Sequence, residues 1–201
     1  MNTQSPEQKG SAIRKKSVAR DWAESILVAF ILAMFIRTFI VQAFKIPTGS
    51  MRMTLLAGDI ILVNKFIYGA KIPFTKYRLP KVHLPKRGDV VVFIFPEDPK
   101  KDFIKRMVGL PGDMVEIKNG TIYVNDQPLV DCGFSQRYYY NRGDFAQEGR
   151  RITVPANNYF VLGDNSASSQ DSRYWGFVPE KNILGEAMVI YWPPQRIRII
   201  K

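Results

Sequence analysis

A long apolar segment near the N-terminus constrains this chain more than any other feature. Residues 22–44 form a stretch of 23 residues, and residues 26–36 are apolar without a break. As a helix rising about 1.5 Å per residue, the stretch would reach roughly 30–35 Å, enough to cross the hydrocarbon layer of a membrane. Glu24 lies near its start, and Arg37 lies where a long side chain reaches the headgroups. The segment predicts a single transmembrane helix.

The charges before this segment predict its orientation. Residues 1–21 are polar, and we expect them to form a disordered basic tail. Its charged residues are Lys9, Arg14, Lys15, Lys16 and Arg20 against Glu7 and Asp21. Short basic flanks stay in the cytoplasm, so we expect the N-terminus inside. Residues 45–201 would then lie on the outer, periplasmic or extracellular, face of the inner (plasma) membrane.

Two other interpretations of the apolar segment are open. A cleaved signal peptide has a shorter apolar region and a small-x-small cleavage site, and residues 41–45 offer no such site. A core helix of a water-soluble domain would be buried by the rest of the chain. We expect an uncleaved anchor.

The remainder of the chain has the pattern of short strands. Runs of β-branched and apolar residues lie at 60–66, 90–95, 159–162 and 187–192. Segments 114–118 and 121–124 flank Asn119-Gly120, which predicts a hairpin because a type I′ turn needs positive φ at both central residues. No long helical pattern follows residue 50. We therefore expect a mostly β fold built on an antiparallel sheet.

The domain organisation follows from these patterns. Residues 45–201 are expected to form one extracytoplasmic catalytic β domain, in which residues 114–155 are a candidate β appendage or flap. Residues 131–150, rich in Tyr, Arg and Gly, are expected to be solvated. We expect a monomer.

Composition excludes several classes of function. The net charge is +11, but no zinc-finger spacing or long Lys/Arg block is present, so we expect no nucleic-acid partner. Cys132 is the only cysteine, so no intramolecular disulfide can form. His83, the only histidine, lies in a Pro-bounded segment and is expected to be solvated. A Ser-His-Asp enzyme is therefore not expected.

A serine and a lysine offer an alternative chemistry. Ser50 follows Gly49 in a turn, and a hydroxyl there is a candidate nucleophile if a base removes its proton. On a strand, Lys105 would share a face with Phe103 and Met107, and Arg106 would point the opposite way. Burial among apolar groups lowers the pKa of a lysine from about 10.4. The alternatives are a plain turn at Ser50 and an outward lysine.

Five motifs, taken in their order along the chain, are specific enough to suggest a known protein family. They are Ile46-Pro47-Thr48-Gly49-Ser50-Met51, Gly58-Asp59 with Val63-Asn64-Lys65, Arg87-Gly88-Asp89, Ile104-Lys105-Arg106 with Gly109-Leu110-Pro111-Gly112-Asp113, and Gly163-Asp164-Asn165 with Asp171-Ser172-Arg173. With the anchor, these motifs resemble the bacterial type I signal peptidases, or leader peptidases, over residues 22–192. That family consists of Ser/Lys dyad serine proteases.

The resemblance implies a role for each matching residue. Ser50 matches the nucleophile and Lys105 the general base. Thr48 and the Ser50 amide match the oxyanion hole, and Ser169 matches the hydroxyl that orients the lysine, although Ser168 could substitute for it. The remaining matches are Asp171 and Arg173 as a structural ion pair, and Ile46, Ile104 and Phe44 as the lining of the substrate pocket.

The resemblance also implies an activity. It implies a membrane-bound endopeptidase that removes signal peptides from secretory preproteins after small residues at −1 and −3, with no metal or cofactor. Apolar residues near the site, Met51, Leu55 and Leu56, are expected to enter the membrane interface. Met53 stands where the family usually has Pro, and the segment around Ser169 departs from the common pattern.

Three rival interpretations remain. The first is a non-catalytic, membrane-tethered β module that keeps these motifs for folding. The second is a self-cleaving Ser/Lys repressor-type protease, but residues 1–44 show no helix-turn-helix pattern. The third is an organelle-type signal peptidase, which the motifs do not separate from the bacterial type.

Overall fold

The computed structural model describes residues 18–73, 75, 77–131 and 133–200. The chain divides into two compact units, Met1–Phe35 and Ile36–Lys201. Most of the predicted basic tail, residues 1–17, lies outside the described residues, and its last four positions, 18–21, are already helical.

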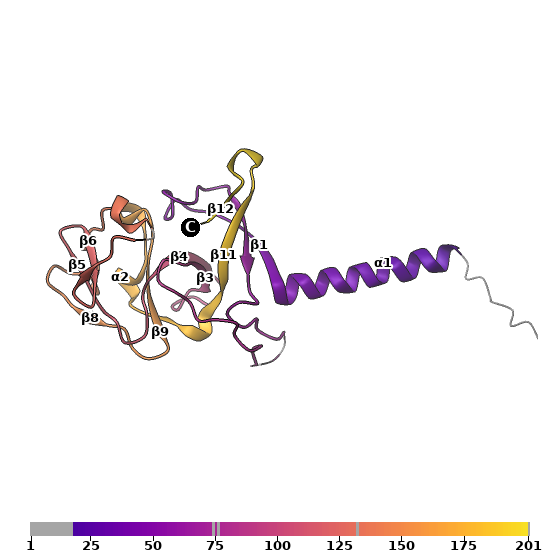
Figure 1. Ribbon diagram of the computed structural model, residues 1–201, viewed down its shortest axis with the longest axis horizontal. Helices are drawn as coiled ribbons and strands as arrows, with labels where there is room; N and C mark the ends of the chain where they lie inside the picture. The colour runs from indigo at the N-terminus through magenta and orange to yellow at the C-terminus, as the bar shows by residue number, and fades with distance from the viewer. Residues whose placement is uncertain (1–17, 74, 76, 132, 201) are drawn as a thin grey trace, which may run out of the picture. The chain divides into compact units, whose positions relative to one another are not determined.

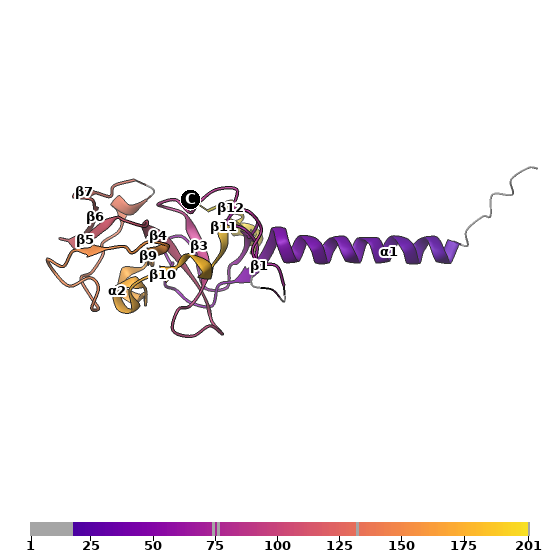
Figure 2. The same ribbon diagram turned by 90° about the horizontal axis from the view of Figure 1, so that it is seen from below.

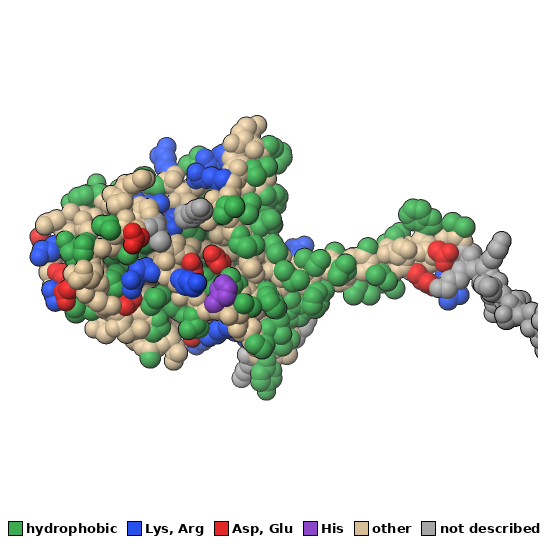
Figure 3. Space-filling model, viewed as in Figure 1, with side chains coloured by type: hydrophobic (Ala, Val, Ile, Leu, Met, Phe, Trp, Pro, Cys, Tyr) green, Lys and Arg blue, Asp and Glu red, His purple; other side chains and the backbone are tan. Residues whose placement is uncertain are grey.

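The apolar segment is a helix, as predicted. Helix α1 (Val18–Phe35) continues into a short π-helical stretch, η1 (Ile36–Ile40). Together they give 23 helical residues, Val18–Ile40, that are long and apolar enough to cross a membrane. The apolar side chains of α1 are exposed along its length (Figure 3). A core helix of a water-soluble domain would bury them.

The helical segment ends four residues earlier than expected. We placed the end of the anchor at Phe44, but residues 41–44 belong to strand β1 (Val41–Lys45). This strand pairs antiparallel with β2 (Ile60–Asn64), from Val41 opposite Asn64 to Lys45 opposite Ile60. The backbone N–H of Lys65 also donates to the carbonyl of Ile40 at 2.9 Å. Strand pairing therefore takes over from the helix at this point.

The second unit is mostly antiparallel β-sheet, which confirms the predicted fold class (Figure 1). The large sheet has the order β1-β2-β11-β3-β4-β9-β10, and β12 pairs with β11. Its other strands are β3 (Val90–Ile94), β4 (Asp102–Gly109), β9 (Asn158–Leu162), β10 (Val178–Pro179), β11 (Ile183–Trp192) and β12 (Arg198–Ile199). The predicted runs at 60–66, 90–95, 159–162 and 187–192 supply β2, β3, β9 and part of β11.

A smaller sheet follows the order β7-β6-β5-β8 and lies at one end of the unit (Figure 2). Its strands are β5 (Met114–Lys118), β6 (Thr121–Val124), β7 (Gln127–Pro128) and β8 (Ile152–Thr153). Asn119 and Gly120 have φ values of 51° and 77°, so both central residues of the predicted hairpin turn are left-handed. The sheet occupies the range that we expected to form an appendage.

Short helical turns connect the remaining strands. They are η2 (Phe134–Gln136), η3 (Ser166–Ser168), α2 (Ser172–Trp175), η4 (Glu180–Asn182) and η5 (Pro194–Arg196).

The segment 131–150, which we expected to be solvated, is partly buried. In the segment 131–150, Phe134, Tyr139 and Ala146 are buried and pack in one cluster with residues of both sheets. Phe134 and Tyr139 therefore belong to a core that residues of both sheets share.

Both faces of the large sheet are covered. On β3, Val90 and Val92 belong to one buried cluster, whereas Val91 and Phe93 belong to another. Alternate side chains of a strand point to opposite faces, so two covered faces require an unbroken apolar run. The same double burial places Lys105 and its neighbour Arg106 out of solvent on opposite faces of β4.

Candidate active site

The turn that carries Ser50 is fixed by its own hydrogen bonds. After β1, the backbone N–H of Ile46 donates to the Asp59 carbonyl and that of Gly58 donates to the Ile46 carbonyl, both at 2.8 Å. Within the loop thus closed, the N–H of Thr54 donates to the Met51 carbonyl at 2.8 Å. Ser50 is therefore presented on a tight turn instead of a mobile loop.

Buried apolar side chains hold this turn in the core. Met51 and Leu55 are fully buried in the cluster that also contains Ile46. The expectation that Met51 and Leu55 enter a membrane interface is therefore wrong, and of that trio only Leu56 is exposed. Met53, which replaces the family's usual Pro, points to solvent with 58% of its surface exposed, so it leaves the packing of the turn intact.

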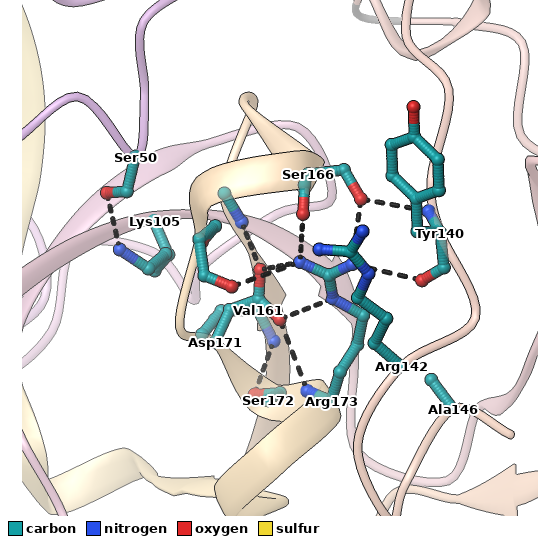
Figure 4. Close-up of polar contacts among 12 residues, drawn as sticks. Ser50, Lys105, Tyr140, Arg142, Ala146, Val161, Ser166, Asp171, Ser172 and Arg173 are labelled. Carbon is teal, nitrogen blue, oxygen red and sulfur yellow. Dashed lines mark hydrogen bonds and ion pairs between the residues drawn. The ribbon is translucent and has the colours of Figure 1, made fainter.

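Strand β4 brings Lys105 to Ser50. The Nζ atom of Lys105 lies 2.8 Å from the Oγ atom of Ser50 (Figure 4). It also donates to the Ile104 carbonyl at 3.0 Å. The Lys105 side chain also passes the Phe103 ring, with Nζ 5.3 Å from its centroid. The two side chains predicted to react are thus in hydrogen-bonding contact.

The surroundings of Lys105 favour its neutral form. Only 4% of the residue is exposed, and this burial lowers its pKa from 10.5 to about 8. The carboxylates of Asp171 and Asp164 oppose the shift because they stabilise the ammonium, and Arg173 adds to it. A lysine with a pKa near 8 supplies a usable fraction of neutral amine near neutral pH, so Lys105 can act as a general base toward Ser50.

A pocket of about 290 Å³ opens beside these two residues. It is lined by Pro47, Thr48, Ser50, Asp102, Phe103, Ile104, Lys105, Ser168 and Gln170. Thr48 is exposed and lines the same pocket as Ser50. Although several of these residues are polar, most of the surface that they expose to the pocket is apolar, which suits a small uncharged side chain of a bound peptide.

Only one of the three residues expected to line the substrate pocket does so. Ile104 does line it, but Ile46 and Phe44 are not among its lining residues. Ile46 is buried in the core, and Phe44 packs against the same cluster. Sequence reasoning missed Phe103, although its position two residues before Lys105 on one strand was a usable signal.

The predicted ion pair between Asp171 and Arg173 is present and fully buried. The Nε and Nη2 atoms of Arg173 lie 2.7 and 2.9 Å from the two carboxylate oxygens of Asp171. Arg173 also donates to the Ser166 hydroxyl, to the Ser166 and Ser169 carbonyls and to the Tyr140 carbonyl (Figure 4). The pair therefore holds the segment 166–171 that forms one wall of the pocket.

The serines expected to orient the lysine are close to the site but not bonded to it. Ser168 lines the pocket, and Ser169 is buried with its hydroxyl making no hydrogen bond to a described residue. The Ser169 hydroxyl instead lies over Gly163, where an added Cβ would come within 2.1 Å of it. No hydrogen bond between either serine and Lys105 is found among the described residues.

A second buried network has no counterpart in the predicted site. The Nε and Nη2 atoms of Arg106 bind the carboxylate of Asp164 at 2.8 and 2.7 Å, with neither side chain exposed. The hydroxyl of Thr54 donates to the same carboxylate, and Arg137 reaches it at 3.1 Å. Asp164 thus joins the turn of Ser50 to the strand of Lys105. Arg106 and Asp164 both belong to the sequence motifs given above, but their pairing depends on the register of strands that are distant in the sequence.

Other chemistries have less support in the described part of the chain. His83 is exposed, as predicted, and takes no part in the site. Across the residues that the structure describes, no group of three or more His, Cys, Asp or Glu side chains is arranged to hold a metal ion.

Comparison with known proteins identifies the family. A family model described as "Signal peptidase, peptidase S26" matches residues 19–192. The chain belongs to this family. The signal peptidase I of Pseudomonas fluorescens is 34% identical over 219 residues, which cover 92% of this chain and 77% of that protein. The probable signal peptidase I-2 of a Synechocystis species is 37% identical over 188 residues, or 89% and 77% of the two proteins.

Among solved structures, a signal peptidase I from Enterococcus faecalis is similar at 33% identity with a TM-score of 0.43, covering 52% of this chain and 97% of that one. Membership in the signal peptidase family confirms the predicted resemblance and makes the protein a serine endopeptidase of that family. The apolar N-terminal helix agrees with a membrane-anchored member.

Proposed function

We propose that this signal peptidase removes N-terminal signal peptides from secretory preproteins at the outer face of the membrane, with Ser50 as nucleophile and neutral Lys105 as general base. The observation that carries the proposal is the 2.8 Å contact between Nζ and Oγ at a lysine whose burial lowers its pKa to about 8. A non-catalytic module would have no need to bury a lysine beside a serine.

The edge of β4 offers a place for the substrate backbone. Strand β9 pairs with β4 only from Arg106 to Gly109, whereas the pocket is lined by residues 102–105 of β4. An extended peptide can therefore add as a strand beside residues 102–104, held by backbone hydrogen bonds. Its −1 side chain would enter the pocket beside Ile104 and Phe103, which favours small residues at −1 and −3.

The reaction then proceeds in two halves, formation of an acyl-enzyme and its hydrolysis. Neutral Lys105 takes the proton of Ser50, and Oγ bonds to the carbonyl carbon of the −1 residue, so that the carbonyl oxygen becomes an oxyanion near Thr48 and the Ser50 amide. Protonated Lys105 gives that proton to the departing amine as the peptide bond breaks. In the second half, Lys105 takes a proton from a water as that water attacks the acyl carbon. Lys105 then returns the proton to Oγ as the bond between Oγ and the acyl carbon breaks, which frees Ser50 and releases the signal peptide with a new carboxyl end.

The orientation of the protein follows from the charge of its tail. The basic residues before α1 favour a cytoplasmic N-terminus, which places the β unit on the periplasmic or extracellular side. There it would meet translocated preproteins and the lipid surface. The substrates are proteins, and the protein acts without a nucleic-acid partner or a cofactor.

The test uses the detergent-solubilised full-length chain and a preprotein with Ala at −1 and −3. The wild type is expected to cut after −1, as read from the new N-terminus by sequencing, and Ser50→Ala is expected to be inactive. Ser135→Ala, which removes an exposed serine, is the matched control and should cut at the wild-type rate. An inactive wild type would favour the non-catalytic module, and a Ser50→Ala protein that still cuts would show that Ser50 is not the nucleophile.

A further inference from the structure

The peptide bond that precedes the nucleophile is held by one asparagine. The side-chain Nδ2 of Asn165 donates to the Gly49 carbonyl at 3.0 Å, and the backbone N–H of Asn165 donates to the Ser50 carbonyl at 2.9 Å. Two successive carbonyls of the nucleophile turn are therefore bound by a single residue. Asn165 lies 115 residues after Ser50 in the chain, three residues after the end of β9.

The first of these bonds sets the direction of an N–H group. A trans peptide unit is planar, so its C=O and N–H point in opposite directions. When Asn165 binds the Gly49 carbonyl, the N–H of Ser50 is turned away from Asn165. No described residue accepts a hydrogen bond from that N–H. The group is therefore held as an unoccupied donor in a residue that lines the pocket.

Asn165 itself rests on a rigid support. In the residue before it, the Asp164 carboxylate is held by Arg106 through two bonds of 2.8 and 2.7 Å. One residue earlier, the N–H of Gly163 donates to the Asp171 carboxylate at 3.0 Å. Both acceptors belong to fully buried ion pairs. The position of the Asn165 amide is therefore fixed by the core and not by the loop alone.

We propose that Asn165 is a positioning residue for the oxyanion hole, which aims the Ser50 N–H at the oxyanion by binding the Gly49 carbonyl. The inference rests on the proposed function, because an oxyanion forms only if Ser50 attacks a carbonyl. A donor stabilises this charge only when it is held in place before the reaction. The effect of Asn165 should therefore appear in the transition state and not in the binding of substrate.

The test compares Asn165→Ala and Asn165→Asp with the wild type. Asparagine and aspartate have the same shape, but the aspartate cannot donate to the Gly49 carbonyl. Both variants keep the backbone bond to the Ser50 carbonyl, so both should stay folded. Asn158→Ala is the matched control, since its Nδ2 also donates to a carbonyl, that of Ala156 at 2.9 Å. We expect kcat to fall about 10- to 100-fold in the Asn165 variants, with KM little changed.

A peptide aldehyde separates positioning from a merely structural effect. Ser50 Oγ adds to the aldehyde carbon, and the former carbonyl oxygen occupies the oxyanion position. We expect the inhibition constant to rise in parallel with the loss of kcat in both variants, while the pH midpoint of kcat/KM in Asn165→Ala, which adds no charge, stays that of the wild type. Asn158→Ala should match the wild type in both readouts.

Three outcomes would overturn the inference. These are an unchanged kcat in both Asn165 variants, a lower kcat with unchanged aldehyde inhibition, and a shifted pH midpoint in Asn165→Ala, which would place the effect on Lys105. All three presuppose a wild type that cuts the preprotein and a Ser50→Ala variant that does not. If that condition fails, the proposed function fails, and the two failures can be told apart.

Discussion

The Nζ atom of Lys105 lies 2.8 Å from the Oγ atom of Ser50, although 55 residues separate them in the chain. The serine comes from a turn closed by its own backbone bonds, and the lysine comes from a strand covered on both faces. The same packing that brings the two side chains together also removes the lysine from water. The same packing therefore sets both the position of Lys105 beside Ser50 and its protonation state.

The first prediction concerns pH. The general base must be neutral, and the pKa of Lys105 is lowered to about 8, so activity should rise with pH through that value. Between pH 7 and pH 9 the neutral fraction of such a group grows about tenfold, and kcat/KM should follow it. The pH–rate profile of preprotein cleavage measures this. A profile that is flat from pH 6 to 10 would contradict the assignment.

The second prediction concerns stability. The pKa of Lys105 falls from 10.5 in the unfolded chain to about 8 in the folded one, so between these values the unfolded chain binds more protons. Stability should therefore rise with pH across this window, and below pH 8 the full cost of burying the amine remains. Lys105→Met removes that cost, on the order of 3 kcal/mol. Denaturant unfolding at pH 7 should show a more stable variant, and one that is less stable would refute this reading.

The third prediction concerns the buried network at Asp164. Asp164→Ala would leave Arg106 and Arg137 without their common carboxylate, and breaking a buried pair in this way costs about 3–5 kcal/mol. Denaturant unfolding should detect this loss. Asp98→Ala is the control, because its partner Lys101 is exposed, and it should leave the transition unchanged. Equal effects of the two variants would show that Asp164 has no special structural role.

The fourth prediction concerns specificity. Ile104 lines the pocket, so Ile104→Ala should enlarge it and allow larger side chains at −1 or −3. Discrimination between Ala and Val at these positions should fall by about tenfold, the range that one or two methylenes give in an apolar pocket. Ratios of kcat/KM for paired preproteins measure this. Ile117→Ala, a buried change in the smaller sheet, should leave the ratio unaltered.

Local features could be predicted from the sequence better than the contacts between segments that are distant in the chain. The hairpin at Asn119-Gly120 follows from backbone conformation alone, and the unbroken run on β3 reflects a strand buried on both faces. The end of the helix at Ile40 was missed, because three of the four residues 41–44 are apolar and their pairing with β2 cannot be seen in the sequence. The burial of Phe134 and Tyr139 was missed for the same reason, since it depends on a second sheet.

The candidate site shows the same limit. Ser50 and Lys105 could be named from their neighbours and from the family resemblance. The contacts of Asp164 with Arg106 and of Asn165 with Gly49 could not, because they join segments more than 50 residues apart. By its position in the motif, Ile46 was expected to line the pocket, but its side chain is buried in the core. Tertiary packing decides which residues of a motif face the substrate.

The most direct test of the account compares two lysine variants of the solubilised enzyme. Lys105→Met removes the proposed base, whereas Lys65→Met removes another lysine whose pKa burial also lowers, and which contacts Gln42 instead of the site. Preprotein cleavage is measured for both from pH 6 to 10, with folding checked by thermal unfolding. We expect a folded, inactive Lys105→Met protein at every pH and a fully active Lys65→Met protein. A folded Lys105→Met protein that retains the wild-type rate would contradict the role of Lys105 as the general base.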